Sequence, residues 1–128
     1  MPKRESELKA ALMRELRAQL PGYVHLRHED RFTSGHPDIS ITGCGRTTWL
    51  EAKHATPKFD SDGIQELTML RLAAAGSAYY VIWHEKNSVK KTMIVHPKHL
   101  HDLMPETFCV GFDHKFIVEY VKKVHQCA

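Results

Sequence analysis

The sequence predicts a single α/β domain in which a central mixed sheet is flanked by helices. Its 128 residues are enough for one compact domain with its own core. The expected elements follow the order helix, three strands, helix, strand, which is typical of a mixed sheet covered by helices. We place this αβββαβ core at about residues 5–96 and a C-terminal strand or helix extension at about residues 97–128.

The first helix is expected from Lys3 to Leu20. Leu8, Leu12 and Leu16 recur every four residues and form one apolar stripe, and a Pro-Gly pair ends the segment. The helix should therefore pack one face on the sheet.

Three short strands are expected next, at Tyr23–Arg27, Asp38–Thr42 and Thr47–Lys53. The last two are separated by the residues GCGR, whose glycines allow the positive φ values of a tight hairpin. These two strands should pair antiparallel.

A second helix is expected at Gly63–Ala75, and its largely apolar surface predicts that it is buried. Ala78–Glu85 is a continuous apolar run, as in a central strand covered on both faces, and Lys91–Val95 should pair with it. A short helix near Pro97 and a final helix at His114–His125 complete the expected elements.

Composition narrows the class of protein. No signal peptide and no apolar run of membrane-spanning length are present, so we expect a soluble protein of the cytoplasm. The formal charge of +3 is compatible with a polyanionic partner. Cys44, Cys109 and Cys127 are widely spaced and odd in number, which favours reduced thiols over a disulfide framework.

Two carboxylates and a lysine stand out in the expected hairpin. Asp38 follows Pro37 at the start of one strand, and Glu51 and Lys53 share a face of the next because side chains alternate along a strand. Pairing through the turn brings Asp38 and Glu51 together at the open end. Two close carboxylates require a cation, and their hard oxygens favour Mg²⁺, Mn²⁺ or Ca²⁺.

This combination indicates phosphodiester hydrolysis. A divalent ion held by two carboxylates retains waters, lowers the pKa of one of them and binds phosphate oxygens. Lys53 then has two alternative roles: to orient or deprotonate the water if its pKa is depressed, or to neutralise charge on the phosphate.

The residues PD, twelve intervening residues and EAK resemble the signature of the PD-(D/E)xK nuclease superfamily. The wider pattern of SGHPDIS, TWLEAK, Gln65 and AAAGSAYYVIW resembles its VRR-NUC branch, to which Holliday junction resolvases are closely related. The resemblance covers about Glu5 to Trp83. It implies a restriction-endonuclease-like αβββαβ core, dependence on Mg²⁺ or Mn²⁺, products with 5′-phosphates and, commonly, a homodimer.

The resemblance also places a glutamate of the first helix at the metal. Glu5 lies within the arc of the leucine stripe, Glu15 lies near its edge and Glu7 projects away, so Glu5 is the first choice and Glu15 the second. The expected metal ligands are then Asp38, Glu51, the Ala52 carbonyl and Glu5.

Gln65 has two alternative interpretations. It follows Asp62 by three residues, which is the spacing of a capping box, or its amide lies near the metal waters or the scissile phosphate. The candidate contacts to the nucleic-acid backbone are residues on loops or strand ends around the carboxylates: Arg27, Arg31, His36, Arg46 and Lys58.

The sequence therefore predicts a metal-dependent DNA endonuclease, which the resemblance directs to branched DNA. A non-specific or nicking nuclease of the VRR-NUC type, a non-catalytic DNA-binding protein on the same fold and an RNA nuclease remain alternatives. Small size and the resemblance favour a phage or mobile-element origin.

Overall fold

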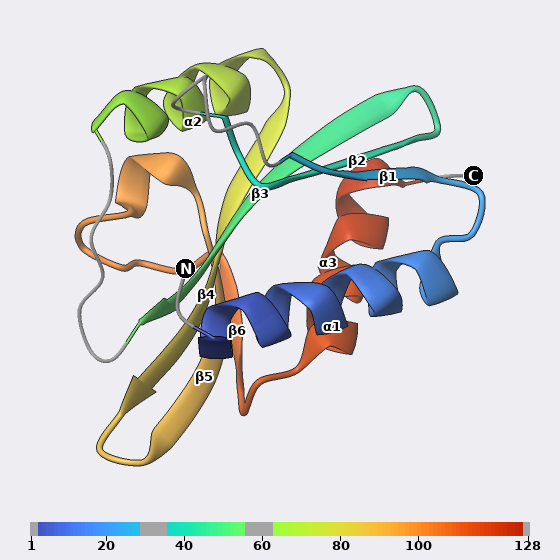
Figure 1. Cartoon of the computed structure of the whole chain (residues 1–128). Helices are drawn as coiled ribbons and strands as arrows, with labels where there is room; N and C mark the ends of the chain where they lie inside the picture. The colour runs from blue at the N-terminus through green and yellow to red at the C-terminus, as the bar shows by residue number, and fades with distance from the viewer. Residues whose placement is uncertain (1–2, 29–35, 56–62, 127–128) are drawn as a thin grey trace.

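A computed structural model describes residues 3–28, 36–55 and 63–126 of the chain, shown in Figure 1. The elements are, in order, α1 (Lys3–Gln19), β1 (Val24–Arg27), β2 (Ile39–Gly43), β3 (Arg46–Ala55), α2 (Gly63–Ala75), β4 (Ser77–Lys86), β5 (Val89–Val95), the 3₁₀ helix η1 (Pro97–His99), β6 (Thr107–Val110) and α3 (His114–His125). None of the helices in these residues has the length and apolarity that a membrane span requires.

The strands form one mixed sheet in the order β1-β2-β3-β4-β5-β6. β3 and β4 are parallel because α2 carries the chain back between them, and the other neighbouring pairs are antiparallel. The predicted α/β class and αβββαβ core are confirmed. The hairpin prediction is confirmed as well, and its turn places positive φ angles on Cys44 and Gly45, as a two-residue hairpin turn demands.

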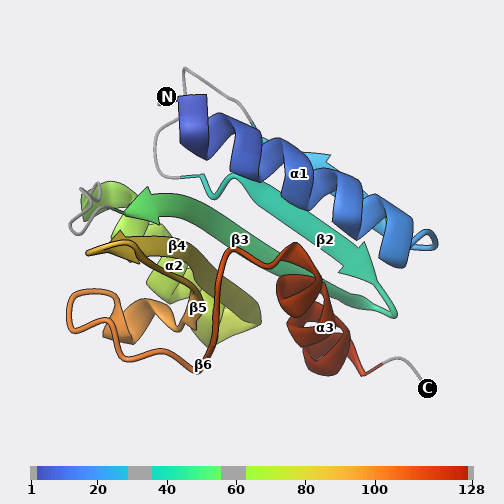
Figure 2. The ribbon, with the colours of Figure 1, turned by 90° about the horizontal axis from the view of Figure 1, so that it is seen from below.

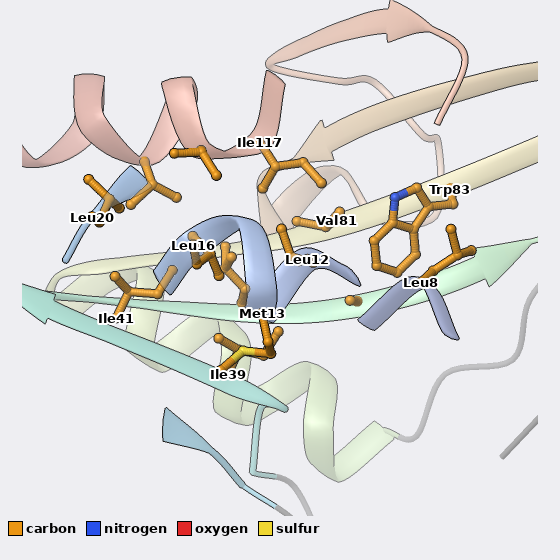
Figure 3. Packing of buried hydrophobic residues seen from close by; sticks show 14 residues of the cluster. Leu8, Leu12, Met13, Leu16, Leu20, Ile39, Ile41, Val81, Trp83 and Ile117 are labelled. Atoms are coloured by element: carbon orange, nitrogen blue, oxygen red, sulfur yellow. The ribbon is translucent and has the colours of Figure 1, made fainter. Parts of the chain in front are cut away.

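Helices cover both faces of the sheet (Figures 1 and 2). The leucine stripe of α1 packs with residues of α3 against β2, β3 and β4, and Leu12 and Leu16 are fully buried there. Figure 3 shows these leucines beside Ile39, Ile41 and Val81. Met69 of α2 belongs to a separate cluster on the other face. The apolar periodicity of α1 therefore predicted its packing correctly.

The prediction that α2 is buried is wrong. Met69 is its only buried residue, while Ile64, Leu67 and Leu70 are more than two-fifths exposed. A helix in the outer layer of the fold contacts the sheet along one side only, so apolar residues around the helix cannot all be covered.

The C-terminal extension adds a strand to the sheet. Its strand, β6, had no predicted position because the segment is only four residues long and mixed in polarity, yet it pairs with β5 at the sheet edge. The predicted final helix is confirmed at His114–His125, and His125 Nε2 lies 2.7 Å from Thr48 Oγ1 of β3.

The expectation of reduced thiols is wrong for Cys44, which is disulfide-bonded, whereas Cys109 is free.

Candidate active site

The site lies on an edge of β3 that β2 leaves open. The pairing of β2 with β3 ends at Ile39 and Leu50, whereas β3 continues to Ala55. Beyond that point, carboxylates satisfy the backbone donors that face β2. The Ala52 N–H donates to Asp38 Oδ2 at 3.3 Å, and the His54 N–H donates to Glu5 Oε1 at 2.9 Å.

Asp38 and Glu51 are brought together at this edge. The Asp38 N–H donates to Glu51 Oε1 at 2.9 Å, and the Glu51 side chain is almost completely buried. The Lys53 ammonium lies 3.2 Å from Glu51 Oε2. Leu50 and Ala52 pack against the leucines of α1. Because side chains alternate along a strand, Glu51 and Lys53 lie on the opposite face of β3.

The electrostatics of this group depend on burial and on its close charges. Burial and the negative charge of Asp38 raise the pKa of Glu51 to about 7, against the lowering effect of Lys53 and Lys9. Burial lowers the pKa of Lys53, but the attraction and hydrogen bond of Glu51, together with the charges of Glu5 and Asp38, outweigh burial, and the pKa is raised. Lys53 is therefore an ammonium group at neutral pH, which favours the second of its two predicted roles, charge neutralisation.

Lys9 of α1 is a member of the cluster that sequence reasoning missed. Its side chain is only 2% exposed, and Nζ lies 2.6 Å from Asp38 Oδ2 and 3.5 Å from Glu5 Oε2. A weaker signal was present, because at 100° per residue Lys9 lies at the edge of the leucine stripe, about 20° beyond Leu16, whereas Glu5 lies inside it. A charged residue on a buried helix face requires a partner of opposite charge.

Glu5 is the buried glutamate of α1, as predicted from the stripe, but it contacts the His54 N–H and Lys9. Gln65 lies one turn before the buried Met69, and its Oε1 atom is buried without a hydrogen-bond partner. The alternative capping partner, Asp62, lies outside the described residues.

The predicted nucleic-acid contacts divide into three groups. Arg27 pairs with Ile39 next to Asp38, and His36 is exposed two residues before Asp38. The prediction that Arg46 flanks the carboxylates is wrong, because it lies at the closed end of the hairpin, where its guanidinium donates to the Val124 carbonyl at 3.2 Å. Five residues of extended strand, roughly 17 Å, separate it from Glu51. The remaining candidates, Arg31 and Lys58, lie outside the described residues.

The donor set suits a hard divalent cation. Asp38 and Glu51 supply carboxylate oxygens. The Ala52 N–H donates to Asp38, and the carbonyl of the same residue faces the same edge of the strand, so it is a third possible oxygen ligand. No group of three or more His, Cys, Asp or Glu side chains arranged for a metal occurs in the described part of the chain, which is consistent with Glu5 being bound to Lys9 and His54. Because Mg²⁺ keeps several waters and needs only one or two carboxylates, the residues present fit this ion.

Comparison with known proteins adds evidence on the fold. No family model and no curated protein sequence matches the chain. Among solved structures, Hjc from Archaeoglobus fulgidus, a Holliday junction resolvase from an archaeal hyperthermophile, superposes with a TM-score of 0.57 and 11% sequence identity over 98% of each chain. The chain therefore shares the fold of this structure. Membership of the PD-(D/E)xK superfamily and of its VRR-NUC branch stays a prediction from the sequence.

Proposed function

We propose that this protein is a divalent-metal-dependent DNA endonuclease that acts on branched DNA. The observation that carries the proposal is the meeting of Asp38, Glu51 and Lys53 at the open edge of β3. The resolvase fold supports it independently of these side chains. In this proposal Mg²⁺ or Mn²⁺ is the cofactor and the products carry 5′-phosphates.

Each side chain has a separate task in the proposed reaction. Asp38, Glu51 and the Ala52 carbonyl hold the metal, which when bound supplies an activated water and a clamp for phosphate oxygens. Lys53 remains charged beside Glu51 and neutralises negative charge that builds on the phosphate during attack. Glu5 fixes the β3 edge through the His54 N–H, so we assign it a positioning task instead of the predicted ligation.

Gln65 is the remaining candidate for contact with the substrate. A buried amide oxygen without a partner is costly, and a metal-bound water or another donor of the assembled complex would satisfy it. We therefore favour the predicted role at the scissile phosphate over helix capping.

DNA binding is proposed at the surface around Asp38. Arg27 and His36 are close to Asp38 in the fold, and Arg31 and Lys58 remain candidates from the sequence. Contacts of this kind go to the phosphate backbone, so affinity is expected to fall steeply with salt and to vary little with sequence.

Action on a four-way junction requires two active sites related by a two-fold axis. The exposed Ile64, Leu67 and Leu70 of α2 form an apolar stripe that the sheet does not cover. We propose that this stripe pairs with its copy in a second chain to form a homodimer.

The proposal is tested with a panel of substrates in the presence of Mn²⁺: a four-way junction, nicked and linear duplexes, single-stranded DNA and duplex RNA. The expected result is paired cleavage of the junction by the native protein and none by the Asp38→Ala variant. Preferential cleavage of nicked or linear DNA would favour the alternative of a non-specific or nicking enzyme. Binding without cleavage of any substrate would favour a DNA-binding protein on this fold.

A further inference from the structure

We infer that Lys9 is a built-in counter-ion that restricts the site to one divalent cation and sets its affinity. The inference rests on the proposed metal site and deepens it. Nothing in the reaction chemistry itself requires this lysine, yet it is buried in the centre of the acidic group. Its position therefore calls for a separate explanation.

The first observation is the geometry of the lysine. Lys9 Nζ lies 2.6 Å from Asp38 Oδ2 and 3.5 Å from Glu5 Oε2, so the ammonium occupies the space between these two carboxylates. A second metal ion shared by Asp38 and Glu5 would have to occupy the same space. Lys9 therefore holds the place that a second cation would take.

The second observation is the balance of charge. The group contains three carboxylates, Glu5, Asp38 and Glu51, and two ammonium groups, Lys9 and Lys53. The five side chains together carry one net negative charge when all are ionised, and one bound divalent ion changes this to one net positive charge. A second ion would leave a large positive charge in a mostly buried place, which is unfavourable.

The third observation is that both carboxylate oxygens of Glu5 already have partners. Glu5 Oε1 accepts the His54 N–H, and Glu5 Oε2 faces Lys9. Glu51 is held in the same way by the Asp38 N–H and Lys53, but Lys53 is partly exposed, whereas Lys9 is buried between Glu5 and Asp38. We therefore infer that Lys9 keeps Glu5 from a metal, while Glu51 stays open to one. Because the same lysine contacts the Asp38 carboxylate that would hold the metal, its positive charge would weaken metal binding.

The experiment measures Mn²⁺ binding by calorimetry for the native protein and for Lys9→Met, Lys9→Arg and the surface control Lys122→Met. Lys122 pairs with Glu119 on α3, far along the chain from the acidic group. The expected stoichiometry is one ion for the native protein, Lys9→Arg and Lys122→Met. Lys9→Met should bind two ions, and its first ion about tenfold more tightly, since a neighbouring positive charge is gone.

Thermal melting gives a second readout that does not depend on activity. In EDTA, Lys9→Met should melt at a lower temperature than the native protein, because Asp38 and Glu5 lose their partner. Mn²⁺ should restore more of its stability than it adds to the native protein. If Lys9→Met folds only when it is refolded with Mn²⁺, this result also supports the inference, because the metal then replaces the missing positive charge.

The outcomes separate this inference from the proposed function. A native protein that binds no Mn²⁺ overturns the metal-dependent function itself. A native protein that binds one ion, together with a Lys9→Met variant of unchanged stoichiometry and affinity, overturns only the role of Lys9. A Lys9→Met variant that stays unfolded with Mn²⁺ present also overturns it.

Discussion

Asp38 and Glu51 are tied to each other at the end of the β2–β3 pairing, where the Asp38 N–H donates to Glu51 Oε1 over 2.9 Å. The contact places two acidic side chains together in a region that is closed to solvent around Glu51. Repulsion between them is tolerated because Lys9 and Lys53 lie on either side. The proposed metal would complete that compensation.

The stability of the metal-free protein should depend on the protonation of Glu51. Its pKa in the folded protein, about 7, lies above the ordinary value of 4.5, so folding favours the protonated form. The resulting stabilisation is complete below pH about 4 and is lost as the pH rises through about 7. Urea unfolding in EDTA between pH 4 and 8 should show this decline, and Glu51→Gln should lack that component. The exposed Glu119→Gln control should keep the native profile, and an unchanged decline in Glu51→Gln would contradict the assignment.

Lys53→Met should reduce the rate of junction cleavage by about 100-fold or more, because the ammonium no longer neutralises charge at the phosphate. Mn²⁺-induced thermal stabilisation should persist, since the carboxylates remain. Lys53→Arg keeps the charge and should recover part of the rate. A Lys53→Met variant that cleaves at the native rate would show that the residue only balances Glu51.

Gln65→Leu should separate the two interpretations of this residue. The change removes a buried oxygen without a partner, so the melting temperature should stay the same or rise. Junction cleavage should nevertheless fall by about tenfold or more. If the side chain acts only as a helix cap, the opposite pattern will appear, with a lower melting temperature and an unchanged rate.

Leu67→Glu should convert the proposed homodimer into a monomer. Leu67 lies in the middle of the exposed stripe of α2 and is 51% exposed in the single chain, so a buried charge there would oppose pairing. Light scattering after gel filtration measures the mass directly. Val110→Glu, on the exposed face of β6, is the matched control and should leave the dimer intact. A native protein that is monomeric at working concentrations would contradict the proposed interface.

Leu16→Ala should lower the free energy of unfolding by about 2–5 kcal/mol, as expected for a fully buried leucine that leaves a cavity. Chemical denaturation measures this loss. Arg17→Ala, on the exposed side of α1, should change the free energy by less than about 0.5 kcal/mol. Equal effects of the two changes would contradict the packing of α1 on the sheet.

Local patterns in the sequence were sufficient to predict most of the fold. The four-residue leucine repeat of α1 is a property of one segment, and it sets which face meets the sheet. The glycine-containing turn between β2 and β3 likewise fixed the register that brings Asp38 near Glu51. The prediction of Glu5 on the buried arc followed from the same periodicity.

Tertiary structure decided what depends on contacts between separate elements. The pairing of Lys9 with Asp38 joins α1 to the residue just before β2, and no local period encodes a partner so distant in the chain. The exposed side of α2 and the addition of β6 depend on which surfaces the rest of the fold leaves free. The sequence determined the segments and their buried faces because backbone periodicity is local, whereas the neighbours of each charge were set by packing across the whole domain.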